Sequence, residues 1–218
     1  MPVKEAIACM SQVLAALEYA HSQGVSHREI SPANILVHAD GTTKLTGFGL
    51  AKSAADPQLT QPGTVMGWLD YMSPEQIKGA PAPDTRTDIY SAGAVLYEMV
   101  TGEPPFVRKS EVEMMMAHVN AAPVPPIVLK PDLPEDLNQI ILIALAKDPS
   151  QRFQNAGQFR EALERLFPAP AAPAPKLVLE MAPPPRPAAS RQLLITGVLA
   201  FLATMAALIL FHNFAHSF

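Results

Sequence analysis

Apolar side chains recur at three- and four-residue intervals along much of the chain up to position 167, and this spacing predicts helices. Within residues 4–22 the pattern forms a single helical stripe, which consists of Ile7, Met10, Val13, Leu14 and Leu17. Gly24 follows this stripe and is expected to end the helix, because glycine readily adopts the left-handed conformation found where helices stop.

Two later segments are more uniformly apolar. Residues 88–99 are apolar on nearly all sides, which predicts a buried helix, and Gly102 is a suitable end for it. Residues 137–146 predict a further apolar helix. Glu135 and Asp136 would lie in its first turn, where a carboxylate interacts favourably with the helix dipole.

Polar residues mark the expected beginnings of the other helices. Ser73 precedes a proline, a combination typical of a helix start. Ser110, with Glu113 three positions later, matches a capping box. Asn155 is expected to cap the last helix of this region, which Pro168 would stop.

A short β-hairpin is predicted after the first helix. Ile35–Val37 and Lys44–Thr46 read as its two strands, and Asp40-Gly41 is the expected turn between them.

The composition changes after position 167. Residues 168–190 are rich in Pro and Ala and are expected to form an extended, solvated linker. Residues 193–211 carry no charge, and about 19 residues in a helix would span about 28 Å, close to the thickness of a bilayer core. Arg186 and Arg191 precede this run and no Lys or Arg follows it. The positive-inside bias therefore predicts a single span of the inner or plasma membrane with the N-terminal part in the cytoplasm. A buried soluble helix is the alternative.

The net charge and the number of cysteines limit the partners and cross-links that the chain is expected to have. The formal net charge of the 218 residues is -4, which gives no indication of a nucleic-acid partner. Cys9 is the single cysteine, so the chain has no internal disulfide, and a small buried side chain is expected at this position.

Five segments in this order resemble one known family: His27–Leu36, Lys44–Lys52, Gly63–Glu75, Asp88–Phe106 and Ala144–Phe153. The first reads His-Arg-Glu-Ile-Ser-Pro-Ala-Asn and resembles the catalytic loop of protein kinases. The second contains Gly-Phe-Gly where that family has Asp-Phe-Gly. Together the segments resemble the C-terminal lobe of bacterial Ser/Thr protein kinases of the eukaryotic-like kind.

The resemblance implies an α+β fold that is mainly α. It places a kinase C-lobe at residues 1–167, the linker at 168–190, a transmembrane helix at 191–212 and a short tail at 213–218. The sequence contains no Gly-rich phosphate loop and no V-A-I-K lysine, so we expect the N-terminal lobe to be missing.

The positions that the resemblance assigns to chemistry depart from the family pattern. Glu29 stands where the family has the catalytic-loop aspartate, and Ser31 where it has a lysine. Gly47 replaces the metal-binding aspartate, while Asn34 matches the second metal ligand. Trp68 stands where the family has a small hydroxyl residue. These departures predict a degenerate reaction centre.

Other roles at this centre stay open. Glu29 is either an impaired base or a carboxylate that stabilises the loop. Ser31 offers one hydrogen bond but no positive charge. Phe48 and Gly49 match the rest of the family's motif, and the resemblance implies that they lie beside the nucleotide.

The residues that the family uses for structure are present. The resemblance implies that His27 stacks in the regulatory core and that Asp88 holds the catalytic loop. It also implies an ion pair between Glu75 and Arg152. Arg28 would pair with a phosphate on the segment between the motifs or with a nearby carboxylate.

Three hypotheses follow. The first is a membrane-anchored pseudokinase fragment that needs no cofactor and acts in signalling by binding other proteins, such as kinases or an N-lobe supplied in trans. The second is an active Ser/Thr kinase that uses ATP and Mg²⁺, with its N-lobe supplied elsewhere. The third is a chain without a stable fold, because loss of the N-lobe would expose apolar surface.

Overall fold

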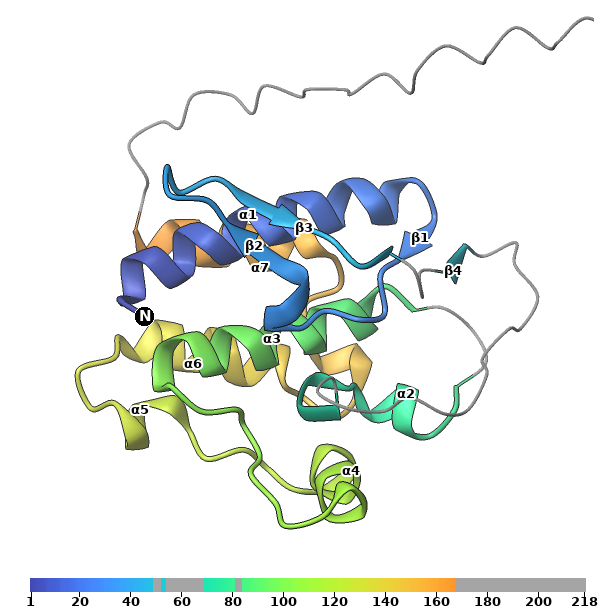
Figure 1. Cartoon of the computed structure of the whole chain (residues 1–218). Coiled ribbons are helices and arrows are strands. Elements are labelled where there is room, and N and C mark those ends of the chain that lie inside the picture. Colours follow the sequence, from blue (N-terminus) through green and yellow to red (C-terminus); the bar gives the residue numbers. More distant parts are fainter. Residues whose placement is uncertain (49–51, 54–68, 81–83, 168–218) are drawn as a thin grey trace, which may run out of the picture. The chain divides into compact units, whose positions relative to one another are not determined.

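The computed structural model describes residues 1–48, 52–53, 69–80 and 84–167 (Figure 1). Gly49, Trp68 and everything from position 168 onward lie outside these ranges. The predicted linker, the predicted membrane span and the domain boundaries therefore stay predictions.

The described part of the chain is mainly helical, as the periodicity predicted. Its α-helices are α1 (Val3–Ser22), α2 (Pro74–Ile77), α3 (Arg86–Thr101), α4 (Glu111–Asn120), α5 (Pro126–Leu129), α6 (Glu135–Ala144) and α7 (Ala156–Leu166). Its 3₁₀ turns are η1 (Pro32–Asn34), η3 (Leu69–Tyr71) and η4 (Pro149–Gln151), and its strands are β1 (Val25–Ser26), β2 (Ile35–Val37), β3 (Thr43–Leu45) and β4 (Lys52–Ser53).

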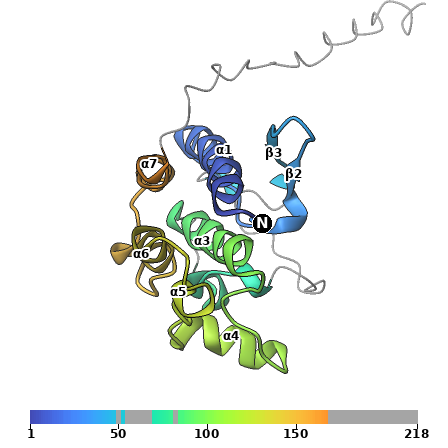
Figure 2. The ribbon, with the colours of Figure 1, turned by 90° about the vertical axis from the view of Figure 1, so that its left-hand side faces the viewer.

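Helix α3 is the centre of the core. Every residue from Thr87 to Tyr97 is buried, which confirms the prediction of a helix enclosed on all sides. Helices α1 and α6 pack against α3, and α7 packs against both α1 and α6 (Figures 1 and 2). The predicted apolar stripe of α1 is buried in this core.

Helix α1 also supports the hairpin. In Figure 2 it lies between α7 on one side and strands β2 and β3 on the other, and it contacts both α7 and β3. The end of the predicted catalytic loop, which runs into β2, is thereby placed beside the core helices.

Helices α3 and α6 approach closely at Gly93. A Cβ atom on this residue would lie only 2.7 Å from the Cβ of Ala144. Real Cβ atoms do not come this close, so the helix spacing requires glycine on α3 and a small residue on α6.

The hairpin forms, and the predicted Asp40-Gly41 pair lies in its turn. Strands β2 and β3 are antiparallel, with Val37 opposite Thr43. The His38 N–H donates to the Thr42 carbonyl, and the Gly41 N–H donates to the His38 carbonyl. With a φ of 84° at Gly41, this is a three-residue loop rather than a two-residue Asp-Gly turn.

Most predicted helix ends are confirmed. Ser73 begins α2 in a full capping box with Gln76. Gly102 ends α3 with a φ of 94°, and the Asn155 side chain caps α7.

The capping box predicted at Ser110 forms only in half. The Ser110 hydroxyl accepts a hydrogen bond from the Glu113 N–H. The Glu113 carboxylate accepts instead from the Lys109 N–H, one residue before the cap.

None of the helices in the described ranges has the length and hydropathy needed to cross a membrane.

Candidate functional site

Asp88, in the first turn of α3, holds the predicted catalytic loop in place. Its side chain is fully buried. One carboxylate oxygen accepts from the His27 N–H at 2.8 Å and the other from the Arg28 N–H at 2.7 Å. His21 Nε2 also lies 2.8 Å from the carboxylate. These contacts replace the water that a buried carboxylate has lost, and they tie the loop to the core helix.

The His27 ring joins this loop to the Gly-Phe-Gly segment. Its Nδ1 accepts from the Glu29 N–H at 3.2 Å, and its Nε2 lies 2.7 Å from the Thr46 carbonyl. The tautomer with hydrogen on Nε2 satisfies both contacts. Phe48 packs against the ring with 4.4 Å between the ring centroids. The two predicted motifs are therefore brought together, with Phe48 still 41% exposed.

Gly47 lies directly beside Asn34. Its φ is 85°, in the left-handed region that favours glycine. A Cβ atom at this position would lie 2.5 Å from both Cγ and Oδ1 of Asn34. The amide of Asn34 thus occupies the space that a side chain at position 47 would need.

The Asn34 side chain is held in that position. Its Nδ2 donates to the Glu29 carbonyl at 2.8 Å. Its own backbone carbonyl accepts from the Thr46 N–H at 2.9 Å. The side chain matched to a metal ligand is therefore engaged in closing the loop.

Glu29 and Ser31 supply no positive charge to this centre. The Glu29 carboxylate is half-buried and forms no hydrogen bond or ion pair with any other residue in the described ranges. Ser31 is 4% exposed, and its hydroxyl does not cap the η1 turn that follows. Over the same ranges, no three His, Cys, Asp or Glu side chains gather as a metal site would require.

Arg28 adopts an unusual backbone conformation, with a φ of 69°. Its N–H donates to Asp88, and its carbonyl accepts from Gln76 Nε2 at 2.8 Å. These two contacts hold the strained residue and connect the loop to α2. Its guanidinium forms no ion pair within the described part of the chain, so both partners proposed for it stay predictions.

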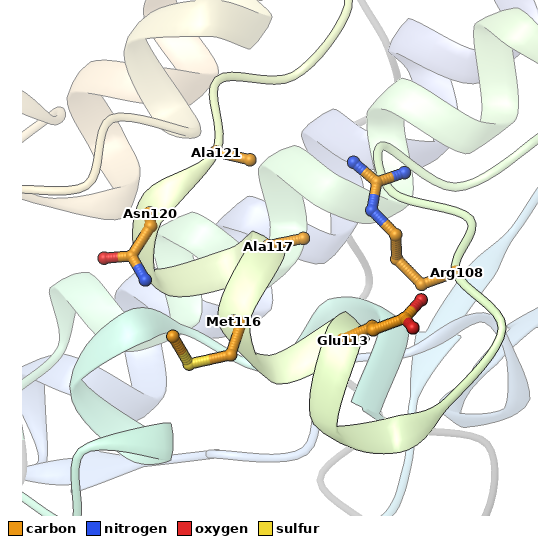
Figure 3. A pocket seen from close by; sticks show the side chains of 6 residues that line it. All are labelled: Arg108, Glu113, Met116, Ala117, Asn120 and Ala121. Atoms are coloured by element: carbon orange, nitrogen blue, oxygen red, sulfur yellow. The ribbon is translucent and has the colours of Figure 1, made fainter.

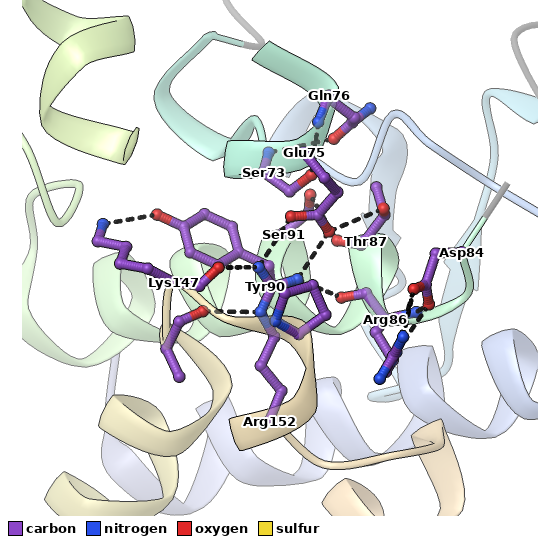
Figure 4. A network of polar contacts seen from close by, with 12 residues as sticks. Ser73, Glu75, Gln76, Asp84, Arg86, Thr87, Tyr90, Ser91, Lys147 and Arg152 are labelled. Carbon is purple, nitrogen blue, oxygen red and sulfur yellow. Dashed lines mark hydrogen bonds and ion pairs between the residues drawn. The ribbon is translucent and has the colours of Figure 1, made fainter. Parts of the chain in front are cut away.

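A second buried network is centred on Arg152 (Figure 4). Its guanidinium makes two contacts with Glu75, of 2.7 and 2.8 Å. The other N–H groups donate to the carbonyls of Arg86, Ala146 and Lys147. All five donors of a buried guanidinium are therefore satisfied, and the ion pair implied by the sequence is present.

Burial alone would raise the pKa of Glu75, but the hydrogen bonds and charge of Arg152 outweigh it, so the pKa lies below its ordinary value. The folded state consequently favours the ionised carboxylate. This contribution to stability is present above pH 4.5 and is lost as the pH falls through the lower pKa of the folded state.

A third polar cluster, which the sequence did not predict, lies between α3 and α4. Tyr90 Oη is 2.9 Å from His118 Nδ1 and 3.3 Å from Lys147 Nζ. Burial and then the charge of Lys147 lower the pKa of His118 to about 4, although the Asp70 backbone opposes this shift. Burial and then the charge of Arg152 lower the pKa of Lys147 to about 8. A tyrosine inside the apolar run 88–99 was the available signal.

Beside α4 lies a hollow of about 420 Å³ that is wide open to solvent (Figure 3). Its lining residues are Arg108, Glu113, Met116, Ala117, Asn120 and Ala121. None of them belongs to the predicted catalytic positions.

Comparison with known proteins identifies the family. The protein kinase domain matches residues 1–167, and the chain belongs to this family. The chain is 40% identical over 182 residues to the serine/threonine-protein kinase PknB of Mycobacterium tuberculosis, covering 83% of this chain and 29% of the relative. It is 39% identical over 181 residues to PknB of Mycobacterium leprae, with the same coverage.

A probable serine/threonine-protein kinase of Clostridium perfringens is 42% identical over 166 residues, which cover 76% of this chain and 24% of the relative. The matches make this a bacterial Ser/Thr-kinase-like protein. It spans less than a third of the length of these relatives.

Replacement of Arg152 by Met should reduce the free energy of unfolding by about 3–5 kcal/mol, because it leaves the Glu75 carboxylate buried without its partner. Urea denaturation of the full chain in detergent measures this loss. The double variant Arg152→Met with Glu75→Gln removes both charges and should recover part of the stability. Equal losses in the single and double variants would contradict this explanation.

Gly47→Ala should destabilise the protein more than Gly41→Ala. Both glycines have a φ near 85°, but a Cβ on Gly41 meets nothing within 4 Å. The left-handed backbone should cost about 1–2 kcal/mol at either position. Displacement of the Asn34 amide should add about 1 kcal/mol at position 47 only. Equal thermal shifts for the two variants would show that the Asn34 contact has no energetic consequence.

Proposed function

We propose that this protein is a catalytically impaired pseudokinase, built on the C-lobe of a protein kinase, which acts in signalling by binding other proteins. The observation that carries the proposal is the pair formed by Gly47 and Asn34. The first offers no side-chain oxygen, and the amide of the second covers the place where one would be.

Membership of the kinase family implies ATP and Mg²⁺, and the residues at this centre do not fit the metal. Mg²⁺ is usually held by carboxylates together with phosphate oxygens. Gly47 replaces the carboxylate, and the Asn34 amide is neutral and already bonded to the Glu29 carbonyl. The centre therefore lacks the ligands that a catalytic Mg²⁺ would need.

The remaining groups are also poorly suited to phosphoryl transfer. The reaction depends mainly on positioning and on positive charge around the transferred group. Ser31 provides a buried hydroxyl where the family has a lysine. Glu29 keeps the negative charge of a base but adds a methylene, and a displacement of about 1 Å at such a centre reduces the rate about 10²-fold.

The contacts that hold the predicted catalytic loop in place support a binding role. Asp88, the Glu75–Arg152 ion pair and the His27–Phe48 contact are all formed, so the loop is well positioned although its chemistry is changed. Leu36 and Val37 beside it are 55% and 53% exposed. This apolar surface suits a protein partner such as a kinase or an N-lobe supplied by another chain.

The proposal places the protein in the inner or plasma membrane, anchored by residues 193–211 with the kinase-like region in the cytoplasm. The uncharged run, with Arg186 and Arg191 before it, supports this placement. Resistance of the full chain to alkaline carbonate extraction tests it, and release into the soluble fraction would oppose it.

An active Ser/Thr kinase is the second candidate. The observation that favours it is the 40% identity to PknB. In that case Glu29 would act as the base, ATP and Mg²⁺ would be required, and the N-lobe would come from elsewhere.

A phosphotransfer assay separates the two candidates. The full chain in detergent is incubated with γ-labelled ATP, Mg²⁺ and a generic Ser/Thr substrate, alongside Glu29→Ala. We expect no label transfer above that of the variant, because the centre lacks both the metal-binding carboxylate and the lysine. Transfer that is lost in Glu29→Ala would overturn the pseudokinase proposal and establish the active kinase.

A further inference from the structure

Helix α4 is attached to the rest of the protein separately from the main core. Its apolar anchor is a small cluster of Phe106, Met114 and Ala117, which is distinct from the core around α3. Its main backbone neighbours are α2 and η3. The attachment of α4 therefore depends strongly on a few specific contacts, whereas α1, α6 and α7 are held by the main core.

One of those contacts is a chain of polar groups beneath α4. His118, on the inner face of the helix, is fully buried, and its Nδ1 lies 2.9 Å from Tyr90 Oη on α3. Lys147 Nζ donates to the same phenol at 3.3 Å and to the Ala117 carbonyl at 3.4 Å. Lys147 and Tyr90 thus contact α4 through both a side chain and the backbone.

The donors in this chain define one protonation state of His118. An ammonium group only donates, so Tyr90 accepts from Lys147 and donates its own hydrogen to His118 Nδ1. The imidazole is then neutral, with its hydrogen on Nε2. That Nε2 is buried, and within the described part of the chain it has no partner in good hydrogen-bond geometry, although the Asp70 backbone lies close enough to favour the charged ring.

A proton added to His118 would be poorly accommodated. Lys147, from the loop after α6, lies 4.4 Å from the Phe106 ring, which in turn packs edge-on against the His118 ring at 4.8 Å. Arg152, after η4, lies 4.9 Å from the centroid of the Tyr90 ring.

The acidic groups near this cluster do not offset the added charge. Glu75 on α2 is already paired with Arg152. Asp70 on η3 acts on His118 through its backbone. An imidazolium would therefore be a buried cation close to Lys147, and no free carboxylate in the described part of the chain lies ready to pair with it.

We propose that His118, together with Tyr90 and Lys147, forms a titratable latch that holds α4 on the protein while His118 is neutral and releases it when His118 is protonated. Release would alter the shape of the open hollow beside α4, because Ala117 lines the hollow and also receives the Lys147 hydrogen bond.

The effect of pH on docking follows from the difference in the proton affinity of His118 between the docked and the released state of α4. The pKa of His118 is about 4 when α4 is docked and would return to about 6.5 when the side chain is in water. The docked state binds fewer protons between these values, so docking weakens as the pH falls through this range. The opening equilibrium should rise about 30-fold between pH 7.5 and pH 5.

Hydrogen exchange on the full chain in detergent tests the latch. Protection factors, corrected for the intrinsic exchange rate, are compared at pH 7.5 and pH 5 for peptides of α4 and of α3. We expect the protection of α4 to fall about 30-fold while that of α3 stays unchanged, because opening is local.

Two variants complete the experiment. His118→Gln keeps a polar side chain that does not titrate in this range, so its α4 protection should be the same at both pH values. His38→Gln removes an exposed histidine and should behave as the unmodified protein does. Loss of protection in α3 together with α4, or a fall in α4 protection that persists in His118→Gln, would overturn the proposal.

If His118→Gln does not fold, NMR titration of the unmodified protein measures the pKa of the His118 ring directly. A pKa well below 6.5 together with the selective loss of α4 protection supports the latch. A pKa near 6.5 with unchanged protection would rule it out.

Discussion

The buried carboxylate of Asp88 is the constraint on which the rest of the site depends. It lies in the first turn of the most enclosed helix and binds the backbone of His27 and Arg28 through its two oxygens. A buried charge needs such partners, so the loop has one favourable position against α3. That position in turn sets the His27 ring against Phe48 and brings Asn34 beside Gly47.

The interactions that hold the loop and helices in place are different from those that a reaction centre would need, so the family's fold does not depend on the family's catalytic side chains. Asp88 binds backbone N–H groups, and Arg152 binds Glu75 and three carbonyls, so neither network requires the side chains at positions 29, 31 or 47. A side chain at position 47 would require Asn34 to move, and Asn34 is bonded to the loop itself.

Periodicity and capping residues were enough to predict the main helices, because burial of one face and satisfaction of the first N–H groups are local requirements. The Asp-Gly pair located the turn at Gly41 but did not determine its length, since a three-residue loop and a two-residue turn share this signal. The half-formed box at Ser110 reflects a nearby competing donor, Lys109. The cluster of Tyr90, His118 and Lys147 could not be predicted, because its members meet only through the packing of α3, α4 and the loop after α6. The sequence identified Gly47 by its position in a motif. Its close approach to Asn34 could not be predicted, because it arises only when the chain folds.

The pseudokinase proposal requires that the centre does not bind a metal and a nucleotide together. Thermal unfolding of the full chain in detergent, with ATP alone and with ATP and Mg²⁺, tests it most directly, because a ligand that binds the folded state raises its apparent stability. We predict one cooperative transition whose midpoint is the same with ATP whether or not Mg²⁺ is present. A rise in the midpoint that appears with ATP only when Mg²⁺ is added would contradict the proposal.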